Sequence, residues 1–99
     1  MTEKTTLDDV VNLGRALSDA TRVRIVSKLL LLEDDSGRPM REIASWFPQD
    51  PSVISRHLLH LRTAGLVSAE RKGKEVLYRA DSAGAGVMLP LLLDVGCIE

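Results

Sequence analysis

The side chains best suited to binding chemistry are basic and short polar residues that gather in the middle of the chain. Residues 53–80 carry six basic and two acidic side chains, hence a net charge of +4, although the whole 99-residue chain has a net charge of −1. The flanking segments 1–52 and 81–99 have net charges of −2 and −3. Because lysine and arginine neutralise phosphates, this local excess of positive charge predicts a nucleic-acid interface in a nearly neutral chain.

A helix expected over residues 51–65 would present this chemistry to DNA. Asp50 and Pro51 form a helix-start signal, an acidic N-cap followed by proline at the first helical position. One face of the helix would be apolar, with Ile54, Leu58, Leu61 and the helix-ending Gly65. The opposite face would carry Ser52, Arg56, Leu59 and Thr63. Such a helix docks by its apolar face, offers polar side chains to the major groove, and attracts phosphate to its N-terminal N–H groups.

A basic hairpin follows this helix. Residues 66–71 and 75–80 have the composition of strands, and Lys72-Gly73-Lys74 between them supplies the glycine that a tight turn needs. We expect Arg71, Lys72 and Lys74 to reach a neighbouring phosphate or the minor groove.

Further helices must position these two elements. Apolar periodicity predicts one helix over 7–17 and a last helix over 84–97, in which Pro90 would kink the helix or set its start. A second helix is expected to begin after an N-cap at Asp19, and a third to have Pro39 in its first turn. The helix over 7–17 would have an apolar face of Leu7, Val10, Val11, Gly14 and Leu17. With three aromatic residues in all, the core must be aliphatic.

This order predicts a mainly α fold with a β-hairpin wing, namely a winged helix-turn-helix with four helices, two strands and a last helix. We expect one domain over 1–99, with a flexible tail over 1–6, the helix-turn-helix over 39–65 and the wing over 66–80.

Four motifs in this order resemble the ArsR/SmtB family of bacterial repressors. The opening motif is Ala16-Leu-Ser-Asp-Ala-Thr-Arg-Val-Arg-Ile-Val. The helix-turn-helix is similar in Glu42-Ile-Ala, Ser52-Val-Ile-Ser-Arg-His-Leu and Leu61-Arg-Thr-Ala-Gly-Leu-Val, and the wing in Arg71-Lys-Gly-Lys-Glu-Val-Leu-Tyr-Arg. The resemblance implies a homodimer formed by the helices over 7–17 and 84–97, which binds a palindromic operator and represses transcription.

The same resemblance suggests individual DNA contacts. Ser52, Ser55 and Arg56 match the positions of the recognition helix that face DNA, Arg41 and Gln49 are expected to contact phosphates, and His60 lies near the DNA. Leu59 departs from the family, which often has a charged residue there. It either contacts a thymine methyl group or a sugar, or it is a neutral surface leucine.

Inducer sensing has a weaker signal. The family's Cys-x-Cys pair is absent from the third helix, and the last segment offers only Asp81, Asp94 and Glu99, so no metal site or cofactor is expected. Cys97 lies where some arsenic-responsive relatives carry a vicinal cysteine pair, but Gly96 replaces one member. Cys97 is either a thiol-reactive or redox site, or an inert thiol. His57 is expected to pack rather than bind metal.

Other functional classes find less support. The chain has no grouping of nucleophile, base and orienting residue, so it is not expected to be an enzyme. Its longest apolar runs are too short for a membrane span and it shows no signal peptide, which predicts a cytoplasmic protein. A winged-helix protein–protein interaction module and a non-inducible DNA-binding regulator remain as alternatives.

Overall fold

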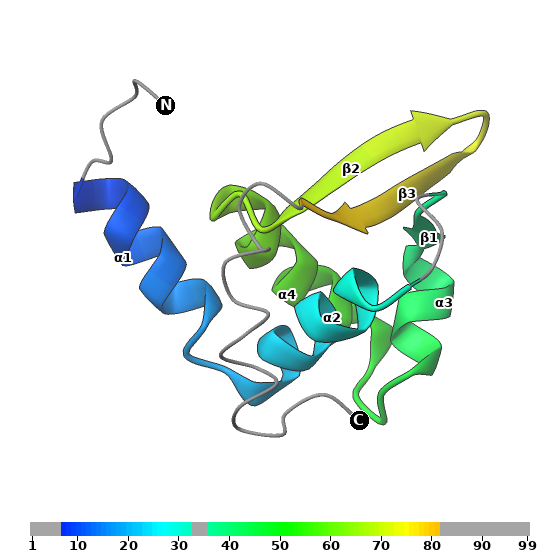
Figure 1. The fold of residues 1–99 in the computed structure, drawn as a ribbon. Helices are drawn as coiled ribbons and strands as arrows, with labels where there is room; N and C mark the ends of the chain where they lie inside the picture. The colour runs from blue at the N-terminus through cyan, green and yellow to red at the C-terminus, as the bar shows by residue number, and fades with distance from the viewer. Residues whose placement is uncertain (1–6, 33–35, 82–99) are drawn as a thin grey trace.

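The structure, a computed structural model, describes residues 7–32 and 36–81 (Figure 1). Its elements in chain order are α1 (Leu7–Ala16), α2 (Ala20–Leu30), β1 (Arg38–Pro39), α3 (Met40–Ser45), α4 (Pro51–Thr63), β2 (Val67–Lys72) and β3 (Glu75–Ala80). The predicted tail over 1–6 and the predicted last helix over 84–97, with Pro90, lie outside these residues. The four helices and the hairpin were predicted in this order, and none of the described helices is long and apolar enough to cross a membrane.

The wing has a third strand that the sequence did not predict. The sheet order is β1-β3-β2, all antiparallel, and Arg38 and Pro39 of β1 pair with Tyr78 and Leu77 of β3. Pro39 was expected in the first turn of a helix, but it has an extended conformation with ψ 157° and serves as the N-cap of α3. Proline tolerates this edge strand because its missing N–H group costs no ladder bond there.

Gly37 allows β1 to lie close to β3. It has a φ of +82°, and a Cβ atom added there would lie 3.0 Å from Leu77 Cβ and 3.3 Å from the carbonyl oxygen of Tyr78. Only glycine adopts this backbone conformation freely, and only glycine has no side chain to displace the strand.

The hairpin projects from the helices on the side opposite to α1 (Figure 1). Lys72 pairs with Glu75, so the loop consists of two residues, Gly73 and Lys74, rather than the expected three-residue tip. Gly73 has a φ of +62°, whereas no residue other than glycine has a positive φ in the described chain. This combination is typical of a type II′ turn, which matches the twist of the paired strands.

The core is aliphatic, as predicted. α2, α3 and α4 bury apolar side chains against one another and against the start of β2, and the α4 members are Ile54, Leu58 and Leu61. The aromatic residues Trp46, Phe47 and Tyr78 are only partly buried and pack around this core. The apolar face of α4 is therefore the one that was expected, and its other face is left for contacts outside the domain.

The ends of α2 and α4 also follow the predicted signals. Asp19 caps α2, and its Oδ1 atom accepts a 2.7 Å hydrogen bond from the N–H of Thr21. Gly65 follows the C-cap of α4 with a φ of +77°. The N–H groups of Gly65 and Leu66 donate to the carbonyl oxygens of Arg62 and Leu61, which is the Schellman arrangement. The cap at Gly65 fixes where α4 ends and the wing begins.

Candidate nucleic-acid interface

The N-terminus of α4 is already occupied by a carboxylate. Asp50 Oδ1 accepts hydrogen bonds from the N–H of Ser52 at 2.9 Å and from its hydroxyl at 2.8 Å, which hold the pKa of Asp50 below its usual range. Pro51 has no N–H group, and the N–H of Val53 donates to the carbonyl of Asp50. The expectation that this helix end attracts phosphate is therefore wrong, because its N–H groups are used and an anion stands among them.

The exposed face of α4 meets the wing in a hollow. This α4–β3 hollow has a volume of about 370 Å³ and is lined by Ser52, Ser55, Arg56, Leu59, Arg62 and Tyr78. Ser52, Ser55, Arg56 and Leu59 therefore lie together on one surface, with no acidic residue in the lining. Leu59 is 60% exposed, so it does not belong to the core.

Five cations of the positive block are not neutralised by a neighbouring acid. The side chains of Arg56, Arg62, Arg71, Lys72 and Lys74 are all exposed and, among the described residues, make no ion pair. Both acids of the block are paired instead: Glu70 with Arg79 at 2.6 Å, and Glu75 with Arg41. The ion pairs thus mask the negative charge of the block and leave cations on α4 and at the hairpin tip.

Besides the hairpin cations, three residues with predicted contacts do not line the hollow. Arg41 on α3 is exposed, and its guanidinium pairs with Glu75 near the hairpin tip. His60 is half-buried and does not line the hollow. The side chain of Gln49 turns toward α2, where its Nε2 atom donates a 2.8 Å hydrogen bond to Thr21 Oγ1 and its Oε1 atom is buried. Gln49 is therefore a packing residue rather than the predicted phosphate contact, because this geometry uses its side-chain amide inside the domain.

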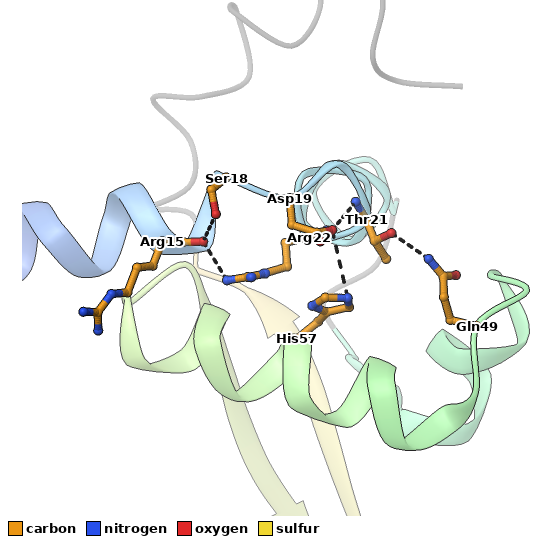
Figure 2. A network of polar contacts seen from close by, with 7 residues as sticks. All are labelled: Arg15, Ser18, Asp19, Thr21, Arg22, Gln49 and His57. Atoms are coloured by element: carbon orange, nitrogen blue, oxygen red, sulfur yellow. Dashed lines mark hydrogen bonds and ion pairs between the residues drawn. The ribbon is translucent and has the colours of Figure 1, made fainter.

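A polar network behind α4 fixes the helix on α2 (Figure 2). Thr21 binds the turn before α4 through Gln49, and His57 on α4 places its Nε2 atom 4.0 Å from Asp19 Oδ1. Arg22 extends the network to α1, because its Nη1 atom donates a 2.6 Å hydrogen bond to the carbonyl oxygen of Arg15. His57 is a packing residue, as predicted, and the network sets the orientation of the recognition helix.

The protonation states of this network follow from burial and charge. Burial lowers the pKa of His57, and the neighbouring Arg22, His60 and Arg56 side chains lower it further against the opposing effect of Asp19. Burial alone would raise the pKa of Asp19. The hydrogen bonds from the N–H groups of Thr21 and Arg22, with the nearby positive charges, outweigh it and hold the pKa below its usual range. At neutral pH, Asp19 is charged and His57 is neutral.

The sensing hypothesis falls outside what the structure describes. Cys97 lies beyond residue 81, as do two of the three acids of the last segment. Within residues 7–32 and 36–81, no three His, Cys, Asp or Glu side chains gather closely enough to hold a metal ion.

Sequence reasoning missed two residues of the hollow, Arg62 and Tyr78. Arg62 lies ten residues after Ser52 and three after Leu59, so helical periodicity alone places it on the same face. Tyr78 comes from β3, and its place opposite α4 depends on how the sheet packs on the helices. Arg62 could have been found from its spacing along the helix, whereas finding Tyr78 required the tertiary structure.

Comparisons with known proteins agree with this geometry. The family model for bacterial regulatory proteins of the arsR family matches residues 19–69, a little over half of the chain. The HTH-type transcriptional repressor SmtB of Mycobacterium tuberculosis is 36% identical over 91 residues, covering 91% of this chain. The chain spans 64% of the length of that relative. The transcriptional activator HlyU of Vibrio cholerae is 30% identical over 96% of this chain and 83% of its own length.

Solved structures give the same answer for the fold. A homodimeric winged helix-turn-helix DNA-binding domain from Mycobacterium bovis, a possible ArsR-family regulator, has a TM-score of 0.72 and 27% identity. The match covers 97% of this chain and 90% of that one. The fold, the order of elements and the matched residues lead to one conclusion: the chain belongs to the ArsR family of bacterial regulatory proteins.

Proposed function

We propose that this protein is a sequence-specific DNA-binding repressor that binds a palindromic operator as a homodimer. The observation that carries the proposal is the distribution of charge on one surface. Five exposed cations on α4 and the hairpin stand without ion-pair partners among the described residues, while Glu70 and Glu75 are each paired with an arginine. A duplex supplies the phosphates that such a surface lacks.

The proposed roles divide the surface into two parts. Ser55 and Arg56, near the N-terminal end of α4, contact base edges in the major groove, with Ser52 beside them. Arg71, Lys72 and Lys74 on the hairpin contact phosphates or the minor groove. Arg41 and His60 are flanking contacts, and Arg41 must leave Glu75 to reach a phosphate.

The apolar face of α1 supports a dimer. Leu7, Val10 and Val11 are 77%, 54% and 41% exposed, and Leu13 is 39% exposed. Burying such a side chain fully contributes about 1.5–3 kcal/mol, so a second copy gives this face a partner. The two recognition helices would then meet half-sites about one helical turn apart. Residues 84–97, predicted from the sequence to form a helix and lying outside the described residues, are the second proposed part of this interface.

The proposal also covers whether the protein represses or activates transcription and what releases it from DNA. Relatives include a repressor, SmtB, and an activator, HlyU, and the higher identity to SmtB favours repression. We propose that a thiol-reactive or other small inducer releases the DNA, with Cys97 as the residue to test by Cys97→Ser. The protein works in the cytoplasm and carries out no catalysis.

Selection from a randomised duplex library tests this proposal and identifies the operator in the same experiment. The purified chain should enrich an inverted repeat, and that repeat placed over a promoter should lower reporter expression when the protein is present. Enrichment of no common sequence would contradict sequence-specific binding and favour a protein–protein interaction module. Increased reporter expression would overturn repression while leaving DNA binding intact.

A further inference from the structure

We infer that the part of the α4–β3 hollow lined by Leu59 and Arg62 holds the sugar–phosphate backbone of one DNA strand, with Arg62 as a phosphate contact and Leu59 against a deoxyribose. This inference rests on the proposed function and adds a defined occupant for a surface that base reading does not explain. It concerns two residues of α4 that lie beyond the polar N-terminal part of the helix.

The path of DNA past the domain places a backbone at the hollow. A helix in the major groove and a wing at the adjacent minor groove have one strand's sugar–phosphate backbone between them. The hollow lies between these two elements, because five of its lining residues, Arg62 among them, are exposed on α4, and Tyr78 comes from β3. The strand that separates the grooves therefore crosses it.

Distance along α4 separates Arg62 from the base-reading residues. With a rise of about 1.5 Å per residue, Leu59 lies about 10 Å and Arg62 about 15 Å along the helix from Ser52. The major groove is about 12 Å wide. When the N-terminal end of α4 contacts base edges, the turn that carries Arg62 has reached the edge of the groove, where the phosphates run.

The chemistry of the lining at Leu59 and Arg62 fits a backbone rather than a base. Two arginines without ion-pair partners among the described residues, Arg56 and Arg62, flank the exposed Leu59, and no acid lines the hollow. Guanidinium groups suit phosphate oxygens, and an aliphatic side chain suits the apolar carbon atoms of a sugar. Ser52 and Ser55, which line the N-terminal part of the hollow, belong to the proposed base-reading end of α4.

The test measures salt dependence with Arg62→Gln, using the full chain and duplexes with a fluorescent label. Arg62→Gln should weaken binding roughly fivefold, equally for the selected repeat and for an unrelated duplex, and should reduce the slope of log K against log salt by about 0.9. Arg24→Gln is the matched control, because Arg24 is an exposed arginine of α2 that does not line the hollow. Unchanged affinity and slope for Arg62→Gln would overturn the phosphate assignment. A loss of affinity that depends on the identity of one base pair in the duplex would overturn it as well.

A second variant tests the sugar contact. Leu59→Ala should weaken binding equally on a normal duplex and on one in which deoxyuridine replaces thymidine, since a sugar contact does not involve the thymine methyl group. If the loss disappears on the deoxyuridine duplex, Leu59 reads a methyl group and its assignment is wrong. Failure of the unmodified protein to bind any duplex at low salt would sink the proposed function itself, which distinguishes the two failures.

Discussion

His57 Nε2 and Asp19 Oδ1 lie 4.0 Å apart, and this contact joins the recognition helix α4 to the capped first turn of α2 (Figure 2). The histidine ring is largely buried and, among the described residues, its Nδ1 atom has no hydrogen-bond partner. Protonation would place a charge in this buried position, facing Arg22, and Asp19 offsets only part of that cost. The contact therefore makes the packing of α4 sensitive to pH.

The free energy of unfolding should fall as pH decreases from neutrality. The unfolded chain binds a proton at His57 near pH 6.5, whereas the folded state resists it until its lowered pKa is reached. Within that window the unfolded state binds more protons, so stability rises with pH, with a slope of at most about 1.4 kcal/mol per pH unit for one group. The lowered pKa values of Asp19 and Asp50 act only below their usual 3.8.

Urea unfolding between about pH 5 and about pH 8 measures this slope. His57→Gln should flatten it, whereas His60→Gln, which removes the other histidine of the same helix, should retain it. Identical slopes for the wild type and His57→Gln would show that the buried ring does not control the pH dependence.

Glu75 restrains Arg41 and lowers the positive charge at the hairpin tip. Glu75→Gln should strengthen duplex binding severalfold and steepen the salt slope by up to about 0.9, because Arg41 becomes available for a phosphate. Stability should change by no more than about 1 kcal/mol, since both side chains are substantially exposed. Fluorescence anisotropy at several salt concentrations measures both the affinity and the salt slope.

Glu70→Gln is the control for this experiment. Glu70 also pairs with an arginine, Arg79, but it lies two strand positions farther from the tip. Its substitution should raise affinity less and leave the salt slope unchanged. Equal effects of the two variants would mean that only overall charge matters, and that Arg41 gains no phosphate contact.

The close approach of β1 to the wing predicts unequal effects at two glycines. Gly37→Ala and Gly73→Ala each place a side chain at a positive φ, which costs about 1–2 kcal/mol. At Gly37 the new Cβ also meets Leu77 Cβ at 3.0 Å, while at Gly73 nothing lies within 4 Å. Gly37→Ala should therefore cost about 1–3 kcal/mol more in unfolding free energy. Equal losses on chemical denaturation would argue against tight packing of β1 on β3.

The exposed face of α1 predicts a variant that separates the dimer. Val10→Glu should shift the protein toward the monomer in sedimentation-velocity experiments, because burying a charge without a partner opposes association. Arg24→Glu adds the same side chain at an exposed polar position of α2 and should leave the dimer intact. A dimer that persists unchanged in Val10→Glu would place the interface elsewhere.

Local patterns predicted the four described helices, the start of α2 and both ends of α4. Asp19, Asp50 and Gly65 act through hydrogen bonds within a few residues of chain, so their roles are visible in the sequence. The buried and exposed faces of α4 follow from helical periodicity alone.

Features that depend on distant parts of the chain were not predictable. β1 has only two residues and exists because Gly37 lets it reach β3, about forty residues further on. The side chain of Gln49 has an amide group that could contact a phosphate, but it points inward and donates a hydrogen bond to Thr21. Arg41 is exposed on α3, yet its pairing with Glu75 depends on how the hairpin folds back. Tertiary contacts, not local sequence preferences, determine where these side chains lie and what they contact.

The most direct test of the proposed recognition helix compares the dissociation constants of wild-type protein and Arg56→Ala for the selected repeat and for a scrambled duplex, at fixed salt. Arg24→Ala serves as the control, and circular dichroism checks that all three proteins remain folded. We predict that Arg56→Ala loses the preference for the repeat, at a cost of about 1–3 kcal/mol, and that Arg24→Ala binds as the wild type does. Undiminished preference for the repeat in folded Arg56→Ala would contradict the assignment of α4 as the recognition helix.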